Sequence, residues 1–157
     1  MGPIYQQLGL AVSPDDCSLA LRGLQTLALR LDKLEKSALT VAHWLAEQPL
    51  VDQVLHPAMV SCPGHDLWAR DFTGSTSVFS FVFDNHIDAE QVINFINNLQ
   101  IFRIGMSWGG VNSLAVVYPD LIRPNQDFAG RIVRLNIGLE TVDDLISDLE
   151  QAFRILA

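Results

Sequence analysis

The sequence predicts an α+β fold in which helices cover a small, mostly antiparallel sheet. Three observations lead to this prediction. A long stretch of helical periodicity comes first, over residues 15–47. A run of β-branched and aromatic residues typical of a strand lies at 75–83. The last three predicted strands follow one another without a helix between them, and strands joined by short connections usually pair in antiparallel fashion.

The first helical region begins at a recognisable helix start. Residues 13–16, SPDD, place Ser13 at the N-cap, Pro14 at the first helical position and two carboxylates in the first turn. Apolar residues then recur at spacings of three and four, at Leu21, Leu24, Leu27, Leu31, Leu34, Ala38, Val41 and Leu45. An interior glycine weakens a helix by about 1 kcal/mol, so Gly23 predicts a break into two helices, the second ending before Pro49.

The middle of the chain alternates strands and helices. Residues 51–57 form a short strand closed by a proline, and 64–72 form a short helix. The strand at 75–83 places valine and serine on one face and three phenylalanines on the other. An amphipathic helix follows at 88–98, with Asp88 near its start.

The last third of the chain is predicted to hold strands at 101–105, 113–119 and 131–138, with a loop at 124–130. The final helix covers 141–156, where Thr141 is the N-cap and two aspartates lie in the first turn.

Composition narrows the class of partner. A chain of 157 residues suits one domain, and 49% hydrophobic residues suffice for a full core. The net charge of −8 disfavours nucleic acid and anionic membranes as partners. No apolar stretch approaches 18 residues, the length that would suggest a membrane span. Two cysteines form no disulfide framework, so we expect a protein of the reducing cytoplasm.

An arginine interrupts the last strand. In IVRLNIGLE, residues 132–140, Val133, Leu135 and Ile137 form an apolar face, and Arg134 lies on the other face. An arginine among core residues is seldom buried unless it is paired. Two interpretations stand level: a salt bridge to one of the 18 carboxylates, or a bidentate clamp for the carboxylate of a substrate.

A glycine-rich stretch, RIGMSWGGVNSL at 103–114, is the second candidate. Its spacing does not match a dinucleotide-binding fingerprint. It predicts either a turn between two strands with Trp108 filling the core, or a loop whose backbone N–H groups approach an anion closely.

Other chemistry-bearing residues give weaker signals. His56, Cys62 and His65 lack a fourth zinc ligand, so they read as solvated or capping residues rather than a metal site. Lys33 and Lys36 are the only lysines, and their pattern is that of a solvated helix face. A lysine that forms a Schiff base needs a desolvated pocket or a strong charge partner. The sequence therefore shows no catalytic nucleophile.

Four segments together resemble the C-terminal domain of the Cys/Met-metabolism, PLP-dependent enzymes. They are residues 19–57, from LALRGLQTL to DQVLHP, then GHDLWARDFTGSTSVFSFVF at 64–83, SWGGVNSL at 107–114 and IVRLNIGLETVDDLISDLEQAF at 132–153. Within the family the resemblance is closest to the cystathionine β-lyases, and WARDFTGS and SWGG carry it. It implies the C-terminal domain of fold-type I PLP enzymes, with residues 14–157 forming a substrate-binding domain and 1–13 the end of the preceding linker.

The resemblance also implies roles for three residues. Arg134 would bind the α-carboxylate of an amino-acid substrate such as cystathionine, and Ser107 and Trp108 would lie beside it. The whole enzyme would be a homo-oligomer that carries PLP. The family's PLP domain, with its Schiff-base lysine and phosphate-binding loop, has no counterpart in this chain, so the chain by itself is expected to bind no PLP and to be inactive.

Two other interpretations remain. One is a stand-alone amino-acid-binding or interaction module that reuses this domain. The other, weaker one is a small zinc protein built on His56, Cys62 and His65.

Overall fold

The computed structural model describes residues 2–9, 11–118, 122–123, 126–128 and 130–156. The chain divides into two compact units, Met1–Asp32 and Lys33–Ala157. All the predicted site residues belong to the second unit.

The first unit is helical and begins as predicted. It holds α1 (Gly2–Gln7), α2 (Pro14–Leu24) and the start of α3 (Leu27–Ala46). The Ser13 hydroxyl accepts a hydrogen bond from the backbone N–H of Asp16 at 3.0 Å, which confirms the N-cap. The predicted break follows Gly23, whose carbonyl accepts from Arg30 Nη2 at 2.7 Å. The guanidinium thus adds a hydrogen bond to a helix-end carbonyl that also accepts from the Thr26 N–H at 3.4 Å.

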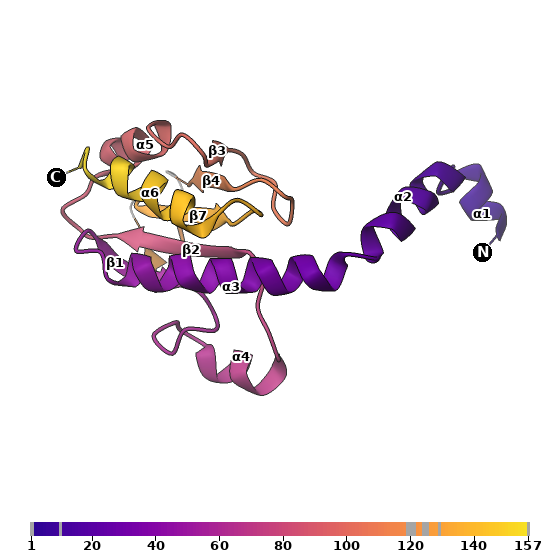
Figure 1. The fold of residues 1–157 in the computed structure, drawn as a ribbon, viewed down its shortest axis with the longest axis horizontal. Coiled ribbons are helices and arrows are strands. Elements are labelled where there is room, and N and C mark those ends of the chain that lie inside the picture. The colour runs from indigo at the N-terminus through magenta and orange to yellow at the C-terminus, as the bar shows by residue number, and fades with distance from the viewer. Residues whose placement is uncertain (1, 10, 119–121, 124–125, 129, 157) are drawn as a thin grey trace. The chain divides into compact units, whose positions relative to one another are not determined.

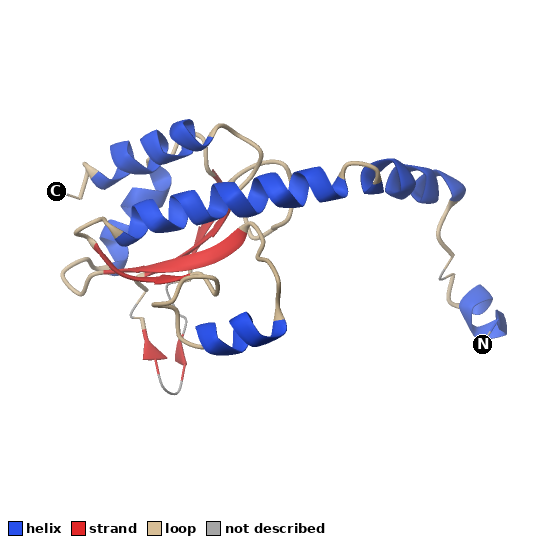
Figure 2. Ribbon diagram, turned by 60° about the horizontal axis from the view of Figure 1, so that its bottom comes forward, coloured by secondary structure: helices blue, strands red, loops and turns tan. Residues whose placement is uncertain are grey.

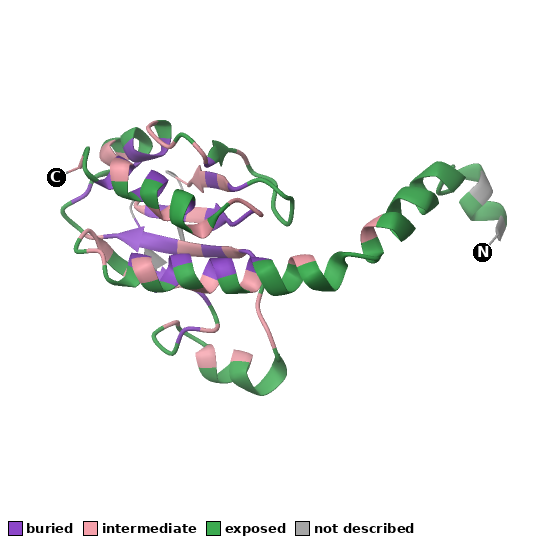
Figure 3. Ribbon diagram, viewed as in Figure 1, coloured by how far each residue is buried: buried purple, intermediate pink, exposed green. Residues whose placement is uncertain are grey.

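The apolar stripe of this region is only half buried. On α3 the periodic residues from Leu34 onward are packed in the core. The earlier ones are exposed, with Leu21 65% and Leu24 60% accessible, and α2 contains no buried residue. Figure 3 shows this change from green to purple along α3. Periodicity thus predicted the helices correctly, but not which part of the stripe is covered within the chain.

The second unit contains the predicted sheet. Its order is β1 (Val51–Leu55), β2 (Val78–Phe83), β7 (Ile132–Asn136), β4 (Leu114–Val117) and β3 (Arg103–Ile104). All neighbouring pairs are antiparallel except β3 and β4. The α+β prediction is confirmed.

Helices α3, α5 (Ala89–Asn97) and α6 (Val142–Phe153) cover one face of the sheet (Figure 2). The core between them contains Phe81 and Phe83 of β2, Leu135 of β7, Phe95 of α5 and Phe153 of α6. These aromatic rings contact one another, with centroids 4.9 Å apart for Phe95 and Phe153. Leu135 points into this core, and successive side chains of a strand point to opposite faces, so Arg134 lies on the other face of the sheet.

The opposite face is covered only in part. Val82, Ile132 and Phe128 form a small second cluster there, against Leu55 and Tyr118. Helix α4 (His65–Asp71) also lies on this side of the sheet, with the strands between it and α3 (Figure 2). The Arg134 face is therefore the less enclosed of the two.

The capping predictions for the last two helices had different outcomes. Asp88 is the N-cap of α5, and its carboxylate and the Gln91 side chain form a reciprocal capping box. Thr141 occupies the N-cap position of α6, but its side chain makes no capping hydrogen bond.

Two further predictions were wrong. The loop predicted at 124–130 contains β6 (Gln126–Asp127), which pairs with β5 (Ile122–Arg123) in a two-stranded sheet. The last three strands of the main sheet are not all antiparallel, because β3 runs parallel to β4. The loop between β3 and β4 is hydrogen-bonded to residues that follow β7. It brings the chain back so that Leu114, at the start of β4, pairs with Arg103, at the start of β3.

A buried carboxylate ties the helix layer to the connection before β3. Asp148 of α6 is 4% exposed, and it accepts hydrogen bonds from the backbone N–H groups of Gln100, Ile101 and Phe102 at 2.8–3.0 Å. The side chain of Gln151 also donates to it, at 3.2 Å. Asp148 thus satisfies three consecutive backbone donors, including that of the buried Phe102.

No helix in the described part of the chain has the length and apolar character needed to cross a membrane.

Candidate functional site

Arg134 lies at the centre of the sheet, on the face away from the main core. β7 is the middle strand, and Arg134 pairs with Ser80 of β2 on one side and Val116 of β4 on the other. Cross-strand partners point to the same face, so small and apolar side chains flank the guanidinium. This setting follows from the alternation that the sequence predicted.

The guanidinium is held by backbone oxygens. Arg134 Nη2 donates to the carbonyl of Met106 at 2.7 Å and to that of Ser107 at 3.3 Å. The Tyr118 ring lies 5.8 Å from Arg134 Cζ, within cation–π distance. Arg134 Nε is buried and has no hydrogen-bond partner within the described residues.

The salt-bridge interpretation of Arg134 has no support in the described residues. The ion pairs found there join other side chains, and none includes Arg134. Carbonyl oxygens satisfy part of its donor set, but they carry no formal negative charge to balance the guanidinium. A buried N–H without a partner is costly, and an anion would satisfy Arg134 Nε only once the protein atoms that cover it moved aside.

The glycine-rich stretch joins β3 to β4, and we call its residues 105–113 the glycine loop. The prediction of a loop between two strands is confirmed, but Trp108 does not fill the core, because it is 66% exposed. Met106 is also exposed, at 71%. The structure brings the Ser107 backbone to Arg134, and it places Trp108 next to Ser107 in the same loop.

Two of the backbone N–H groups that would bind an anion in the glycine loop are already bonded within the protein. The Gly109 N–H donates to Asn136 Oδ1 at 2.8 Å, and the Gly105 N–H donates to the Ala115 carbonyl at 3.2 Å. These two N–H groups are therefore engaged within the protein. Gly109 has φ +75°, a left-handed conformation that glycine adopts without strain.

Two polar clasps fix the glycine loop to the end of β7. In the first, Asn136 bonds Gly109 N and, through Nδ2, the Asn112 carbonyl at 3.0 Å. In the second, the carboxylate of Glu140 accepts from the N–H and hydroxyl of Ser113, each at 2.8 Å. The Ser113 hydroxyl in turn accepts from the Gly138 N–H at 2.8 Å.

Gly138 is placed where no side chain fits. A Cβ there would meet the Glu140 carboxylate, and it would lie 2.5 Å from the Val111 carbonyl oxygen and 2.6 Å from Asn112 C. We expect Gly138→Ala to separate the glycine loop from β7 and to destabilise the chain by about 2–3 kcal/mol, in the range of overpacking. Gly110→Ala is the matched control, since a Cβ there meets nothing within 4 Å. Urea unfolding measures both, and equal midpoints for the two variants would contradict this account.

The two lysines are far from the Arg134 face. Both are exposed on α3, which packs on the opposite face of the sheet. A Schiff base with PLP requires a lysine beside the substrate site, and neither Lys33 nor Lys36 meets this requirement. The residues of this chain therefore do not fit covalent attachment of PLP.

His56, Cys62 and His65 are engaged in local contacts. His56 Nδ1 accepts from the Ala58 N–H at 3.2 Å, and His65 Nδ1 lies 2.9 Å from the Pro57 carbonyl. Burial lowers the pKa of His56 and raises that of Cys62. In the described part of the chain no group of three or more His, Cys, Asp or Glu side chains is arranged to hold a metal.

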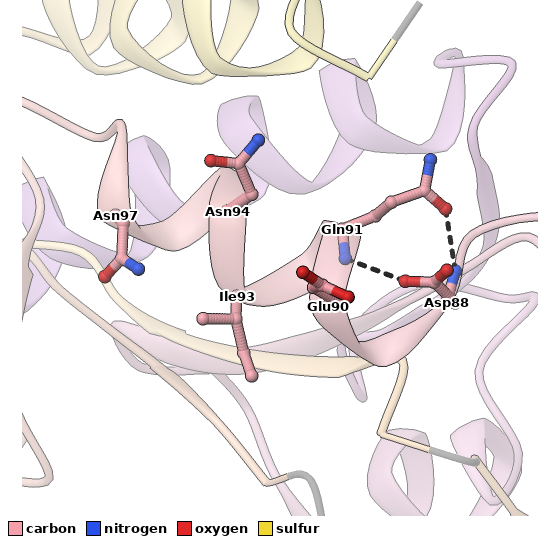
Figure 4. Close-up of a pocket in the computed structure, with 6 residues that line it drawn as sticks. All are labelled: Asp88, Glu90, Gln91, Ile93, Asn94 and Asn97. Atoms are coloured by element: carbon pink, nitrogen blue, oxygen red, sulfur yellow. Dashed lines mark hydrogen bonds between the residues drawn. The ribbon is translucent and has the colours of Figure 1, made fainter.

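A surface hollow over α5 is separate from all of these residues. It has a volume of about 530 Å³ and is lined by Asp88, Glu90, Gln91, Ile93, Asn94 and Asn97. Figure 4 shows that Asp88 and Gln91 are bonded to each other there. This hollow presents carboxylates and amides on one helix and contains none of the predicted site residues.

Sequence reasoning missed the residues that hold the site. Asn136, Ser113 and Glu140 are polar, and Asn136 and Ser113 are almost wholly buried, at 1% and 0% exposed. The one signal was Asn136 itself, a second polar residue two positions after Arg134 on the same face of the strand.

Comparison with known proteins agrees with this fold. Residues 2–154 match the model of the Cys/Met metabolism PLP-dependent enzyme family. Cystathionine beta-lyase MetC of Escherichia coli K12 is 45% identical over 93% of this chain and 38% of its own length. Cystathionine beta-lyase of Haemophilus influenzae is 42% identical over 96% of this chain and 39% of its own.

A solved structure extends the agreement to three dimensions. O-acetylhomoserine sulfhydrylase of Wolinella succinogenes superposes with a TM-score of 0.80 at 29% identity, covering 95% of this chain and 40% of that one. The chain thus spans about two fifths of the length of the relatives it matches. With a family match over residues 2–154 and relatives that are 42–45% identical over more than nine tenths of its length, this chain belongs to the Cys/Met metabolism PLP-dependent enzymes.

Proposed function

We propose that this chain is the substrate-binding C-terminal domain of a cystathionine β-lyase-like, PLP-dependent carbon–sulfur lyase of methionine and cysteine metabolism. In this proposal residues 14–157 form that domain, and residues 1–13 are the end of the linker from a PLP domain. The family membership and the β-lyase relatives support the class of reaction.

Arg134 carries the proposal. Its guanidinium is held from one side by two carbonyls, and its Nε–H is buried without a partner in the described residues. The planar fork of a guanidinium suits a carboxylate bound in bidentate fashion, and such a carboxylate would supply the partner that Nε lacks. We assign to Arg134 the α-carboxylate of an amino-acid substrate. Ser107 and Trp108 lie in the loop that borders this position and would limit where the rest of the substrate extends.

The chemistry at the substrate's carbon atoms is assigned to the rest of the enzyme. PLP supplies the electron sink in this family, and the lysines of this chain do not fit its attachment. The contribution of the present residues is to bind and orient the carboxylate, and the chain by itself is proposed to be inactive.

The test compares the chain alone with a chimera. In the chimera, this chain replaces the matching C-terminal part of Escherichia coli cystathionine beta-lyase MetC. We expect the chimera to release pyruvate from L-cystathionine, and the chain alone to release none. Borohydride reduction of the chain with PLP should leave Lys33 and Lys36 unmodified in the mass spectrum.

Two results would contradict the proposal. Reduced PLP on either lysine of the isolated chain would show that its residues suffice for attachment. A chimera that folds and takes up PLP but cleaves no cystathionine would favour a stand-alone amino-acid-binding module instead.

We also propose that the chain forms homo-oligomers. Helix α2 exposes Leu19, Leu21 and Leu24 by 60–65%, and adjacent apolar side chains left in water tend to become an interface. The chain should therefore exceed its monomer mass of 17.4 kDa in light scattering at high concentration.

Substitution of the exposed leucines tests that interface. The double variant Leu21→Ser, Leu24→Ser is expected to lower the measured mass toward that of the monomer. Ser18→Ala, on the same exposed helix, is the control and should leave it unchanged. A wild-type chain that stays monomeric would count against the proposal.

A further inference from the structure

We infer that Asn136 is a positioning residue for Arg134. It holds the glycine loop so that the carbonyls of Met106 and Ser107 remain against the guanidinium. The inference rests on the proposed role of Arg134 and adds to it a residue that acts through the loop, without touching the substrate.

The hydrogen bonds of Asn136 require an amide. Its Oδ1 accepts from the Gly109 N–H at 2.8 Å and from the Ser77 hydroxyl at 2.9 Å, and its Nδ2 donates to the Asn112 carbonyl at 3.0 Å. The side chain is 1% exposed, so water does not replace a lost partner easily. A carboxylate would set an oxygen against the Asn112 carbonyl, and a hydrocarbon would satisfy none of the three groups.

Arg134 and Asn136 hold successive parts of one loop. They lie two residues apart on β7 and face the same side of the sheet, about 7 Å apart along the strand. Arg134 bonds the carbonyls of Met106 and Ser107, and Asn136 bonds the N–H of Gly109 and the carbonyl of Asn112. The loop is thus attached to one face of one strand at four atoms. Release of the Asn136 half removes the constraint that keeps the other half in place.

The second clasp keeps the rest of the structure intact when Asn136 is changed. Glu140 holds Ser113 at the entrance to β4, and Leu139 N–H donates to the Val111 carbonyl at 2.8 Å. Neither contact involves the Asn136 side chain. A change at Asn136 should therefore loosen the segment from Met106 to Gly110 and leave the sheet paired.

The experiment uses the full chain, labelled with ¹⁵N, and follows hydrogen exchange by NMR. In Asn136→Ala we expect exchange at the Gly109 amide and at Arg134 Nε–H to be at least about 5-fold faster, the factor that corresponds to loss of one hydrogen bond. The Phe81 amide, in the interior strand β2, should keep its protection. Asn136→Ser is the second variant, for use if Asn136→Ala folds poorly. Serine retains a hydroxyl for Ser77 but is too short to bond the loop, so the same faster exchange is expected.

Ser77→Ala is the matched control. It removes a hydrogen bond from the same Asn136 oxygen, and Ser77 is also buried, but its side chain makes no bond to the glycine loop. This variant should leave Arg134 Nε–H exchange as in the wild type. If Ser77→Ala accelerates it as much as Asn136→Ala does, Asn136 serves general stability and the inference is overturned.

A titration with sodium acetate connects the loop to carboxylate binding. In the wild type, acetate should shift the Arg134 Nε–H signal, and Asn136→Ala should weaken the apparent affinity at least about 5-fold. Unchanged affinity together with a loosened loop would overturn the inference. If the Arg134 Nε–H signal of the wild type does not shift with acetate, the proposed function is contradicted instead. The exchange rates alone would then decide the role of Asn136.

Discussion

Arg134→Ala in the chimera should lower kcat/KM for L-cystathionine by about 10- to 100-fold. A hydrogen bond to a charged group contributes about 1.5–3 kcal/mol, a bidentate pair lies at the upper end of that range, and each 1.36 kcal/mol corresponds to about tenfold in rate. Arg134→Lys should be nearly as damaging, because an ammonium point charge does not reproduce the planar fork. Steady-state kinetics of the three proteins provide the measurement.

The control for charge is Arg103→Ala, since Arg103 is an exposed arginine on the edge strand β3. It should leave kcat/KM within about twofold of the unsubstituted chimera, as surface substitutions usually change free energies by no more than about 0.5 kcal/mol.

A thermal melt separates binding from stability at Arg134. In the chain alone, Arg134→Ala should be mild or even stabilising, because it removes a charge that has no counter-charge among the described residues. Unchanged kinetics with a collapsed melting temperature would make Arg134 a structural residue and refute the carboxylate assignment.

Asp148→Ala should produce the largest loss of stability. The change leaves the backbone N–H groups of Gln100, Ile101 and Phe102 without their acceptor, and of these residues Phe102 is buried, Ile101 is half-buried and Gln100 is exposed. An unsatisfied buried donor costs about 1–3 kcal/mol, so we expect a total of about 4 kcal/mol. At about 2–4 °C per kcal/mol for a chain of this size, the melting temperature should fall by about 10 °C.

Asp144→Ala is the control for Asp148. It removes the same carboxylate from the same helix, but Asp144 is exposed in the first turn. There it is expected to contribute only about 0.5 kcal/mol, through the helix dipole. Similar melting temperatures for the two variants would show that the buried hydrogen bonds of Asp148 contribute little.

Local patterns predicted most of the secondary structure because the forces behind them act over a few residues. The SPDD start of α2 and the phenylalanines of β2 are contained in short segments, and each is confirmed. The break after Gly23 is also confirmed, since a glycine weakens a helix wherever it lies in the chain. The loop predicted at 124–130 was wrong because a two-residue strand such as β6 has no periodicity to detect.

Burial was harder to predict than helix or strand. Trp108 is an aromatic residue between two strands, a pattern typical of the core, yet it is exposed at the tip of the glycine loop. The leucines of α2 have the spacing of a buried face and remain in water within this chain. Spacing shows which residues share a face, but not whether another element covers it.

The sequence by itself determined the family, the α+β fold and the position of an unusual arginine in the last strand. It did so because helix caps, hydrophobic periodicity and motifs are formed by residues that are close together in the sequence. Only the tertiary structure decided what surrounds Arg134: the parallel pairing of β3 with β4, the carbonyls of Met106 and Ser107, and the clasp by Asn136. These contacts join residues 24–28 positions apart. Such hydrogen bonds depend on the path of the folded chain, and local sequence patterns do not encode that path.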